Sequence, residues 1–485
     1  MPSPAVSATG VSATLALSRW MVESDYATLP QNVIDHIKWC VIDTVACGLG
    51  GRATPEADAL IRMADRLGEG GKGTVFGERG RRFSILQAAQ INRVLINILD
   101  YDDTIIRTGH MSTVAVATAL AVGENVKADG RAIIAALAMA YEGVLRLRTA
   151  IDPTLEAFRT TFERVDTGVP FCATIAAGKL LGLDAERMAG ALGLTGHIKP
   201  WHVTTPPMGE FGMPAWFKVT QGDGVIPGIQ AAFLAADGFP GDTGIFDEDR
   251  GYERQVGSDR FNAEPLLRGA DPNFELLDIG FKHEACCRHI SAFAEALTAI
   301  QQQHKIGADD IASIEVRAHR WTVENLKNPR PAHMIGAQFS MPHCLAMTAL
   351  GVPTGMAWFR DDALQDPTVD ALRRRVRLVH DERAQRIYDQ EKRYAGEVAV
   401  TSKNGAVLTH FCPAPRGALG NPFSEEDHHT KLSQMAAQAG LSAAQTEALW
   451  TMLRDLEWTD DEQAILKPFA FLTMKPMLYV VNVSE

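Results

Sequence analysis

A short polar stretch between two apolar runs carries the residues best suited to acid–base chemistry. In residues 98–117, ILDYDDTIIRTGHMSTVAVA, helical periodicity ends at Asp100 and resumes after His110. A histidine just ahead of a helix N-terminus experiences a field that keeps its imidazole neutral, so it can accept a proton near pH 7. The same residues also fit a polar loop whose aspartates cap helices and whose histidine is only hydrogen-bonded.

The second apolar run predicts a helix that begins directly after His110. Ser112 or Thr113 is the expected N-cap, because a hydroxyl oxygen can accept a hydrogen bond from a free N–H group of the first turn. Asp102 and Asp103 are expected to act as caps or ion-pair partners whether or not the loop is catalytic.

Helices dominate the elements that must position this loop. In the first long one, Gly48, Gly50 and Gly51 are expected to stop the helix. Many of these segments are rich in alanine and glycine, which lets helices approach closely in a buried bundle. Segments with apolar residues at helical spacing cover 30–51, 85–99, 131–147, 170–183 and 184–194.

After about residue 273 the pattern changes to alternating and β-branched segments, with Asn404-Gly405 as a hairpin turn between the last two. Helical patterns lie among these strands and return in the last part of the chain. The sequence therefore predicts a mainly α fold with a large all-helical domain and a smaller α+β lid. The predicted domains are residues 1–272 (helical), 273–414 (lid) and 415–485 (helices returning to the first domain).

The composition limits the partners. Of the 485 residues 46% are hydrophobic, and 47 Lys and Arg against 59 Asp and Glu give a formal charge of −12. A chain this acidic is poorly suited to nucleic acid or to an anionic membrane. Residues 1–20 lack the basic region and the apolar run typical of a signal peptide, and the sequence shows no apolar run of membrane-spanning length and no metal-type spacing among its seven cysteines. We expect a soluble cytoplasmic protein.

The pair His428-His429 is interpreted as part of a solvated helix start.

The segment LDYDDT, followed six residues after its threonine by a histidine, resembles the signature of the MmgE/PrpD family. That family includes 2-methylcitrate dehydratases, cis-aconitate decarboxylases and an iminodisuccinate epimerase. The resemblance implies the same helical domain and lid, an active site between them, a homodimer, and chemistry without a metal or organic cofactor. Further similar segments, in the expected order, lie at 43–51, 167–196, 217–241, 281–297 and 337–350.

The resemblance also assigns roles to individual residues. Asp100, Thr104 and His110 match the first active-site segment, with His110 transferring a proton and Asp100 orienting it or holding its charge. Lys218 and Lys282 match two site lysines that would bind substrate carboxylates from opposite walls. Arg288, in the lid motif FKHEACCRHISAF, fits either a substrate-binding role or a structural ion pair.

Three segments depart from the family pattern. Val165 stands where many members carry a second catalytic histidine. His283 and Glu284 replace a usual proline and tyrosine, and Ser291 replaces a usual histidine. His343 occupies a common tyrosine position and is the candidate for a second acid or base.

The expected function is a cofactor-independent lyase of the dehydratase type that acts on a small di- or tricarboxylate. Proton transfer beside a carboxylate is also the central step of two alternatives, decarboxylation of an aconitate-like acid and epimerisation of a dicarboxylate. The loss of a histidine at Val165 keeps open a third alternative, a family member that binds a carboxylate without catalysis.

Overall fold

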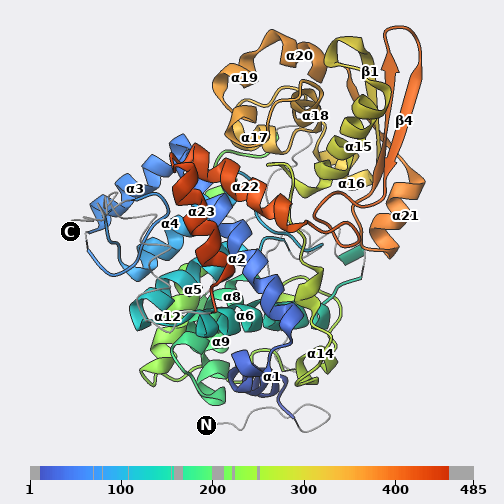
Figure 1. The fold of residues 1–485 in the computed structure, drawn as a ribbon. Helices are drawn as coiled ribbons and strands as arrows, with labels where there is room; N and C mark the ends of the chain where they lie inside the picture. Colours follow the sequence, from blue (N-terminus) through green and yellow to red (C-terminus); the bar gives the residue numbers. More distant parts are fainter. Residues whose placement is uncertain are drawn as a thin grey trace, which may run out of the picture.

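The computed structural model describes residues 11–68, 70–78, 80–106, 109–154, 156–157, 168–198, 212–220, 224–247 and 252–457. A helical body forms the larger part of the molecule, and a smaller part with the only described sheet lies against one end of it (Figure 1). This confirms the predicted fold class. None of the described helices is long and apolar enough to cross a membrane.

The helical body is built around helices that are buried on every side. Residues Ser112–Glu124 of α5 and Val169–Gly178 of α8 are buried throughout, as expected for helices at the centre of a bundle. The helices α4, α6, α9 and α12 pack around these two. The bounds are α1 (Ala13–Glu23), α2 (Gln31–Arg52), α3 (Pro55–Leu67), α4 (Ile85–Asn97), α5 (Ser112–Val126), α6 (Gly130–Ala150), α8 (Val169–Leu180), α9 (Ala185–Ile198), α11 (Phe217–Thr220), α12 (Val225–Ala236), α13 (Tyr252–Gln255) and α14 (Glu264–Leu267).

Helix α2 does not stop at its glycines, contrary to the expectation from sequence. It continues to Arg52, and the glycines are points of close contact with other elements. A Cβ atom on Gly51 would lie 1.9 Å from the carbonyl oxygen of Leu95 in α4. Only glycine permits this approach of α2 to α4, the helix that leads into the polar loop.

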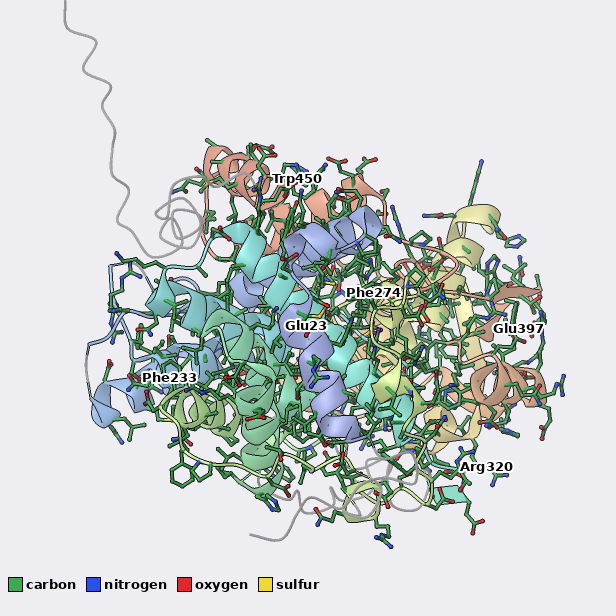
Figure 2. The ribbon with its side chains drawn as sticks, turned by 90° about the horizontal axis from the view of Figure 1, so that it is seen from below. Glu23, Phe233, Phe274, Arg320, Glu397 and Trp450 are labelled. Carbon is green, nitrogen blue, oxygen red and sulfur yellow. The ribbon has the colours of Figure 1, made fainter. Side chains whose placement is uncertain are left out.

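The lid contains a four-stranded sheet in the order β2-β1-β3-β4. Strands β1 and β2 are parallel, whereas β3 is antiparallel to both β1 and β4. The predicted hairpin at Asn404-Gly405 joins β3 to β4. Viewed from below, Arg320 and Glu397 of the lid lie at the opposite side of the molecule from Phe233 of the helical body (Figure 2). The bounds are α15 (Arg288–His304), β1 (Ile311–Ala318), α16 (Arg320–Asn325), α17 (Met334–Gln338), α18 (Met341–Ala349), α19 (Asp361–Gln365), α20 (Pro367–Arg373), β2 (Val376–His380), α21 (Glu382–Gln390), β3 (Gly396–Ser402) and β4 (Val407–Cys412).

The last two described helices cross back onto the helical body, where α22 (Glu425–Gln438) and α23 (Ala443–Arg454) pack against α2 (Figure 1). The sequence suggested that His428 lies in a solvated helix start, but the structure buries it. Its ring stacks on Trp39 with centroids 4.6 Å apart and is 3% exposed, because α22 turns this face towards α2. The domain boundaries near residues 273 and 414 remain predictions.

Candidate active site

The polar loop folds by turning sharply after α4. Asp100 adopts a left-handed backbone conformation with a φ of 51°, which aspartate tolerates better than most residues. Thr104 then pairs with Gly280 of the segment leading into the lid, through two backbone hydrogen bonds of 2.9 Å. The loop is therefore tied to both parts of the molecule, and it ends at His110, just before α5.

Asp103 caps α5, and neither Ser112 nor Thr113 acts as the N-cap. The Asp103 carboxylate accepts hydrogen bonds from the Ser112 N–H at 3.2 Å and from the Tyr141 hydroxyl at 2.8 Å. Burial, together with the nearby charge of Asp102, raises the pKa of Asp103 to about 7. Asp103 therefore has the capping role expected of it, and Ser112 is the first residue of the helix.

His110 is paired with Asp102. The Nδ1 atom of His110 lies 2.9 Å from Oδ2 of Asp102, and the other carboxylate oxygen accepts a hydrogen bond from the Asn97 amide at 2.9 Å. Burial alone would raise the pKa of Asp102, but His110 lowers it below its usual range. A charged carboxylate can only accept a hydrogen bond, so Nδ1 carries the hydrogen, and in the neutral ring the lone pair is on Nε2.

The free Nε2 atom faces a buried ion cluster. It lies 3.6 Å from Oδ1 of Asp100, and the His110 side chain is 14% exposed. Lys218 forms an ion pair with Oδ1 of Asp100, and Lys282 lies 3.1 Å from Oδ2 of the same carboxylate. Both lysines and Asp100 are almost completely buried. The structure thus brings together Asp100, His110, Lys218 and Lys282, as the sequence predicted.

The two lysines contact the same buried carboxylate, Lys218 at Oδ1 and Lys282 at Oδ2 of Asp100. Lys282 also donates to the backbone oxygens of Asp100 and, at 3.2 Å, Cys286. Burial works against the charge on Asp100, but Lys218, Lys282 and His110 together lower its pKa far below the usual range. Burial lowers the pKa of Lys218, whereas for Lys282 the charges of Asp100 and Asp102 outweigh burial and raise it. Substrate binding by either lysine remains a prediction.

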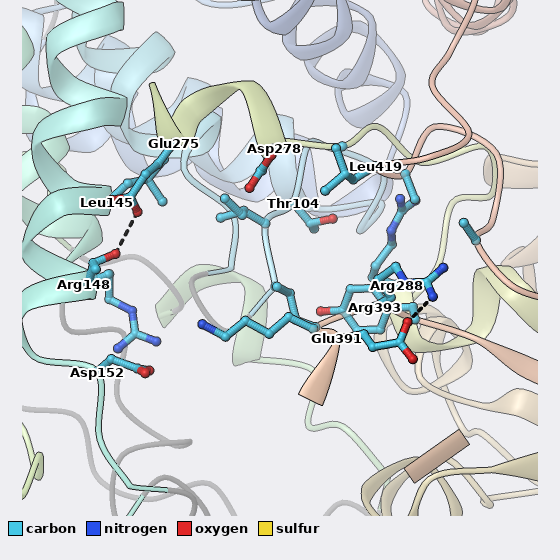
Figure 3. Close-up of a pocket in the computed structure, with 18 residues that line it drawn as sticks. Thr104, Leu145, Arg148, Asp152, Glu275, Asp278, Arg288, Glu391, Arg393 and Leu419 are labelled. Atoms are coloured by element: carbon cyan, nitrogen blue, oxygen red, sulfur yellow. Dashed lines mark hydrogen bonds and ion pairs between the residues drawn. The ribbon is translucent and has the colours of Figure 1, made fainter. Parts of the chain in front are cut away.

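Thr104 and Arg288 lie in a neighbouring cleft of about 360 Å³ between the helical body and the lid (Figure 3). Arg288 donates to the Phe281 carbonyl at 2.6 Å, and the Thr104 hydroxyl is buried with no hydrogen-bond partner among the described residues. Other charged side chains of both signs line the same cleft: Arg148, Asp152, Glu275, Asp278, Glu391, Lys392 and Arg393. The lining does not include Asp100, His110, Lys218 or Lys282.

His343 is not joined to this cluster by any contact within the described ranges. Its Nε2 atom lies 2.6 Å from the carbonyl oxygen of Trp358, and burial lowers the pKa of its imidazole to about 4. A carbonyl oxygen only accepts, so Nε2 must donate the hydrogen. The structure therefore gives His343 a structural hydrogen bond within the lid.

The other departures from the family pattern are also placed by the structure. His283 is half exposed and pairs with Glu284 at 3.0 Å, while Ser291 is buried in α15. Val165 lies outside the described residues. Among the residues that the structure describes, no group of three or more His, Cys, Asp or Glu side chains is arranged to hold a metal ion.

The match to known proteins extends over both parts of the chain. The MmgE/PrpD N-terminal domain matches residues 15–264, and the MmgE/PrpD C-terminal domain matches residues 285–457. The chain belongs to the MmgE/PrpD family. The resemblance seen in the sequence motifs is thereby confirmed.

Several known proteins are similar to this chain along most of its length. The cis-aconitate decarboxylase of Aspergillus terreus is 23% identical, with 83% of this chain and 85% of that protein covered. The human cis-aconitate decarboxylase is 24% identical, with 89% of each chain covered. The 2-methylcitrate dehydratase of Cupriavidus necator is 26% identical, with 86% of this chain and 90% of that protein covered. These relatives agree with the expected lyase of the dehydratase or decarboxylase type.

Proposed function

We propose that this protein is a lyase that acts on a small di- or tricarboxylate by proton transfer at a carbon next to a carboxylate. The observation that carries the proposal is the pair formed by His110 and Asp102, with Nε2 of His110 directed at the ion cluster of Asp100. The named relatives, cis-aconitate decarboxylases and 2-methylcitrate dehydratases, support the same class of reaction.

In the dehydration that we rank first, the C–H bond beside a carboxylate breaks and its proton passes to Nε2 of His110. The electron pair forms the new double bond as the C–O bond on the adjacent carbon breaks, and the imidazolium of His110 returns the proton to the departing hydroxyl, which leaves as water. The charge of Asp102 then stabilises the imidazolium, as a buried aspartate does behind other catalytic histidines. Asp100 lies 3.6 Å from the protonated nitrogen and contributes in the same direction.

The lysines are proposed to balance the charge. With Asp100 and Asp102 ionised, Lys218 and Lys282 leave the cluster neutral, so an anionic substrate is not repelled while His110 is neutral. Once His110 takes the proton, the cluster becomes positive, and this favours the extra negative charge that develops on the substrate. Thr104 and Arg288 are proposed to bind a second polar group of the substrate from the adjacent cleft.

Decarboxylation is the second candidate, favoured by the cis-aconitate decarboxylases among the relatives. In this reaction the proton moves in the opposite direction, from the imidazolium of His110 to the substrate carbon, as the bond to CO₂ breaks. We further propose, from the family resemblance, that the protein is a cytoplasmic homodimer and needs no metal or organic cofactor.

The test is to incubate the purified protein with citrate-, 2-methylcitrate-, cis-aconitate-, malate- and aminosuccinate-like acids in D₂O and to follow the proton NMR spectrum. New vinyl signals from a hydroxy acid indicate dehydration, and loss of CO₂ from an unsaturated acid indicates decarboxylation. Deuterium entering one acid without net change would instead indicate an epimerase. No change in any acid would overturn the proposal and favour a binding protein.

A further inference from the structure

A lysine from the returning C-terminal helix reaches the underside of the ion cluster. Lys431 lies on α22, and its side chain is buried between α2 and the polar loop. The ammonium group donates to Oδ1 of Asp43 at 2.6 Å, to the carbonyl oxygen of Tyr101 at 2.7 Å and to the carbonyl oxygen of Lys282 at 3.2 Å. All three N–H donors of Lys431 are therefore used.

The two carbonyls that Lys431 holds belong to the two segments that build the cluster. Tyr101 lies between Asp100 and Asp102 in the loop, and the Tyr101 hydroxyl in turn donates to the carbonyl of His283 at 2.9 Å. Lys282 opens the lid motif and is itself bound to Asp100. One ammonium group thus joins the loop that carries the carboxylates to the segment that carries a site lysine.

The loop needs such support because its backbone is not held by regular secondary structure. Asp100 adopts a left-handed conformation, which is less favourable for any residue with a Cβ atom. Its carbonyl oxygen is bound by Lys282, and the next carbonyl along the chain is bound by Lys431. Two lysines therefore fix two consecutive peptide groups at the point where the carboxylates are aimed.

We propose that Lys431 is a positioning residue, which sets the direction of Asp102 towards His110 and of Lys282 towards Asp100 by holding the carbonyls of Tyr101 and Lys282. It touches neither substrate nor reacting atoms. The proposal rests on the proposed function only where turnover is measured, because the arrangement of His110 can be observed without substrate.

The alternative is that Lys431 serves only as the partner of Asp43. A buried ion pair can be replaced by apolar side chains with little loss of stability, whereas removing one partner alone leaves an uncompensated charge. The double variant Lys431→Met/Asp43→Leu therefore removes the ion pair together with the carbonyl contacts. The variant Asp43→Asn removes the charge of Asp43 but leaves Lys431 in place to hold both carbonyls.

The experiment measures melting temperature, kcat, KM and the NMR titration of His110 in protein labelled at histidine, with the His110 signal assigned by its loss in His110→Gln. We expect the double variant to melt near the parent but to lose kcat by about 10²-fold with KM within about threefold, as misplacement of a catalytic group does. We also expect its His110 signal to titrate at a different pH. Asp43→Asn should keep kcat within about threefold and keep the His110 titration, even if it melts earlier.

Lys179→Met is the matched control, because the Lys179 ammonium also binds two backbone carbonyls, those of Val22 at 3.1 Å and Ser24 at 2.6 Å, away from the cluster. It should leave kcat and the His110 titration unchanged. A double variant with parental kcat and His110 titration would overturn the proposal, and so would an Asp43→Asn variant that loses as much kcat as the double variant. If the parent converts none of the acids, the proposed function fails, but the NMR titration still decides the role of Lys431.

Discussion

The imidazole Nδ1 of His110 lies 2.9 Å from Oδ2 of Asp102, a carboxylate with no measurable exposure in the same loop. This contact fixes both the ring orientation and the tautomer, and it leaves Nε2 as the nitrogen that faces Asp100. A histidine held in this way is prepared to accept a proton from a substrate that reaches the ion cluster.

His110→Ala should abolish turnover without unfolding the protein, because the ring contributes chemistry and its partly exposed position contributes little to the core. We expect kcat to fall by ~10²–10⁴, as for removal of a general acid or base. His429→Ala is the control, since His429 lies on the outer part of α22 and pairs with Glu447. Activity of His110→Ala within about threefold of the parent would remove His110 from the mechanism.

Asp102→Asn should lower kcat by about 10² or more while the melting temperature stays close to that of the parent. The side-chain amide can donate to Nδ1, which favours the tautomer with the hydrogen on Nε2 and blocks that nitrogen as a base. Steady-state kinetics and circular dichroism on the same preparation provide the check. A variant with parental kcat would show that the contact with Asp102 is structural only.

His343→Tyr should have a mild effect, with kcat within about threefold of the parent. The Nε2 atom of His343 donates its hydrogen to the Trp358 carbonyl oxygen. In addition, an imidazole whose pKa is lowered to about 4 is a weak base near pH 7. The kinetic constants of the variant test this expectation. A fall in kcat of about 10² with little change in KM would instead restore His343 as a second acid or base.

His428 should make the protein sensitive to acid. Burial, reinforced by the charge of Lys431, lowers the pKa of His428 to about 3, so the unfolded chain binds a proton between about pH 6.5 and pH 3 that the folded chain does not. The stability gained from neutral His428 is present above pH 6.5 and is lost as the pH falls, by at most about 1.4 kcal/mol per pH unit for one group.

The measurement is urea unfolding of the parent and of His428→Phe, which keeps a ring to stack on Trp39. The free energy of unfolding of the parent should fall faster than that of the variant from pH 7 to pH 4.5. A difference between the two proteins that stays constant over this range would contradict the lowered pKa.

The fold class and the residues that form the polar loop were predictable from the sequence, because both depend on local patterns. Apolar periodicity placed the helices, and the loop residues Asp100 and His110 are close in sequence as well as in space. Asp100, which the sequence named as the residue that orients His110 or holds its charge, lies 3.6 Å from Nε2, and Asp102, expected only as a cap or ion-pair partner, is the residue that binds Nδ1.

Long-range contacts explain the remaining differences. The sequence assigned Lys218 and Lys282 to one site, but the pairing of both with Asp100 depends on three segments more than 60 residues apart in the chain, which no local pattern shows. The role of Lys431 had no local signal, because its three partners come from α2, the loop and the lid. His428 carried only the pattern of a polar helix start, and its burial follows from the packing of α22 on α2.

The most direct test of proton transfer by His110 is the rate at which solvent deuterium enters the carbon next to the carboxylate of a converted acid. With an unsaturated acid in D₂O, hydration (the reverse of dehydration) and decarboxylation both add a solvent proton to that carbon, so the parent protein should place deuterium there, and His110→Ala should do so more slowly by ~10² or more at equal enzyme concentration. Incorporation by His110→Ala at the parental rate, or conversion of the unsaturated acid by the parent into a product without deuterium at that carbon, would contradict the account.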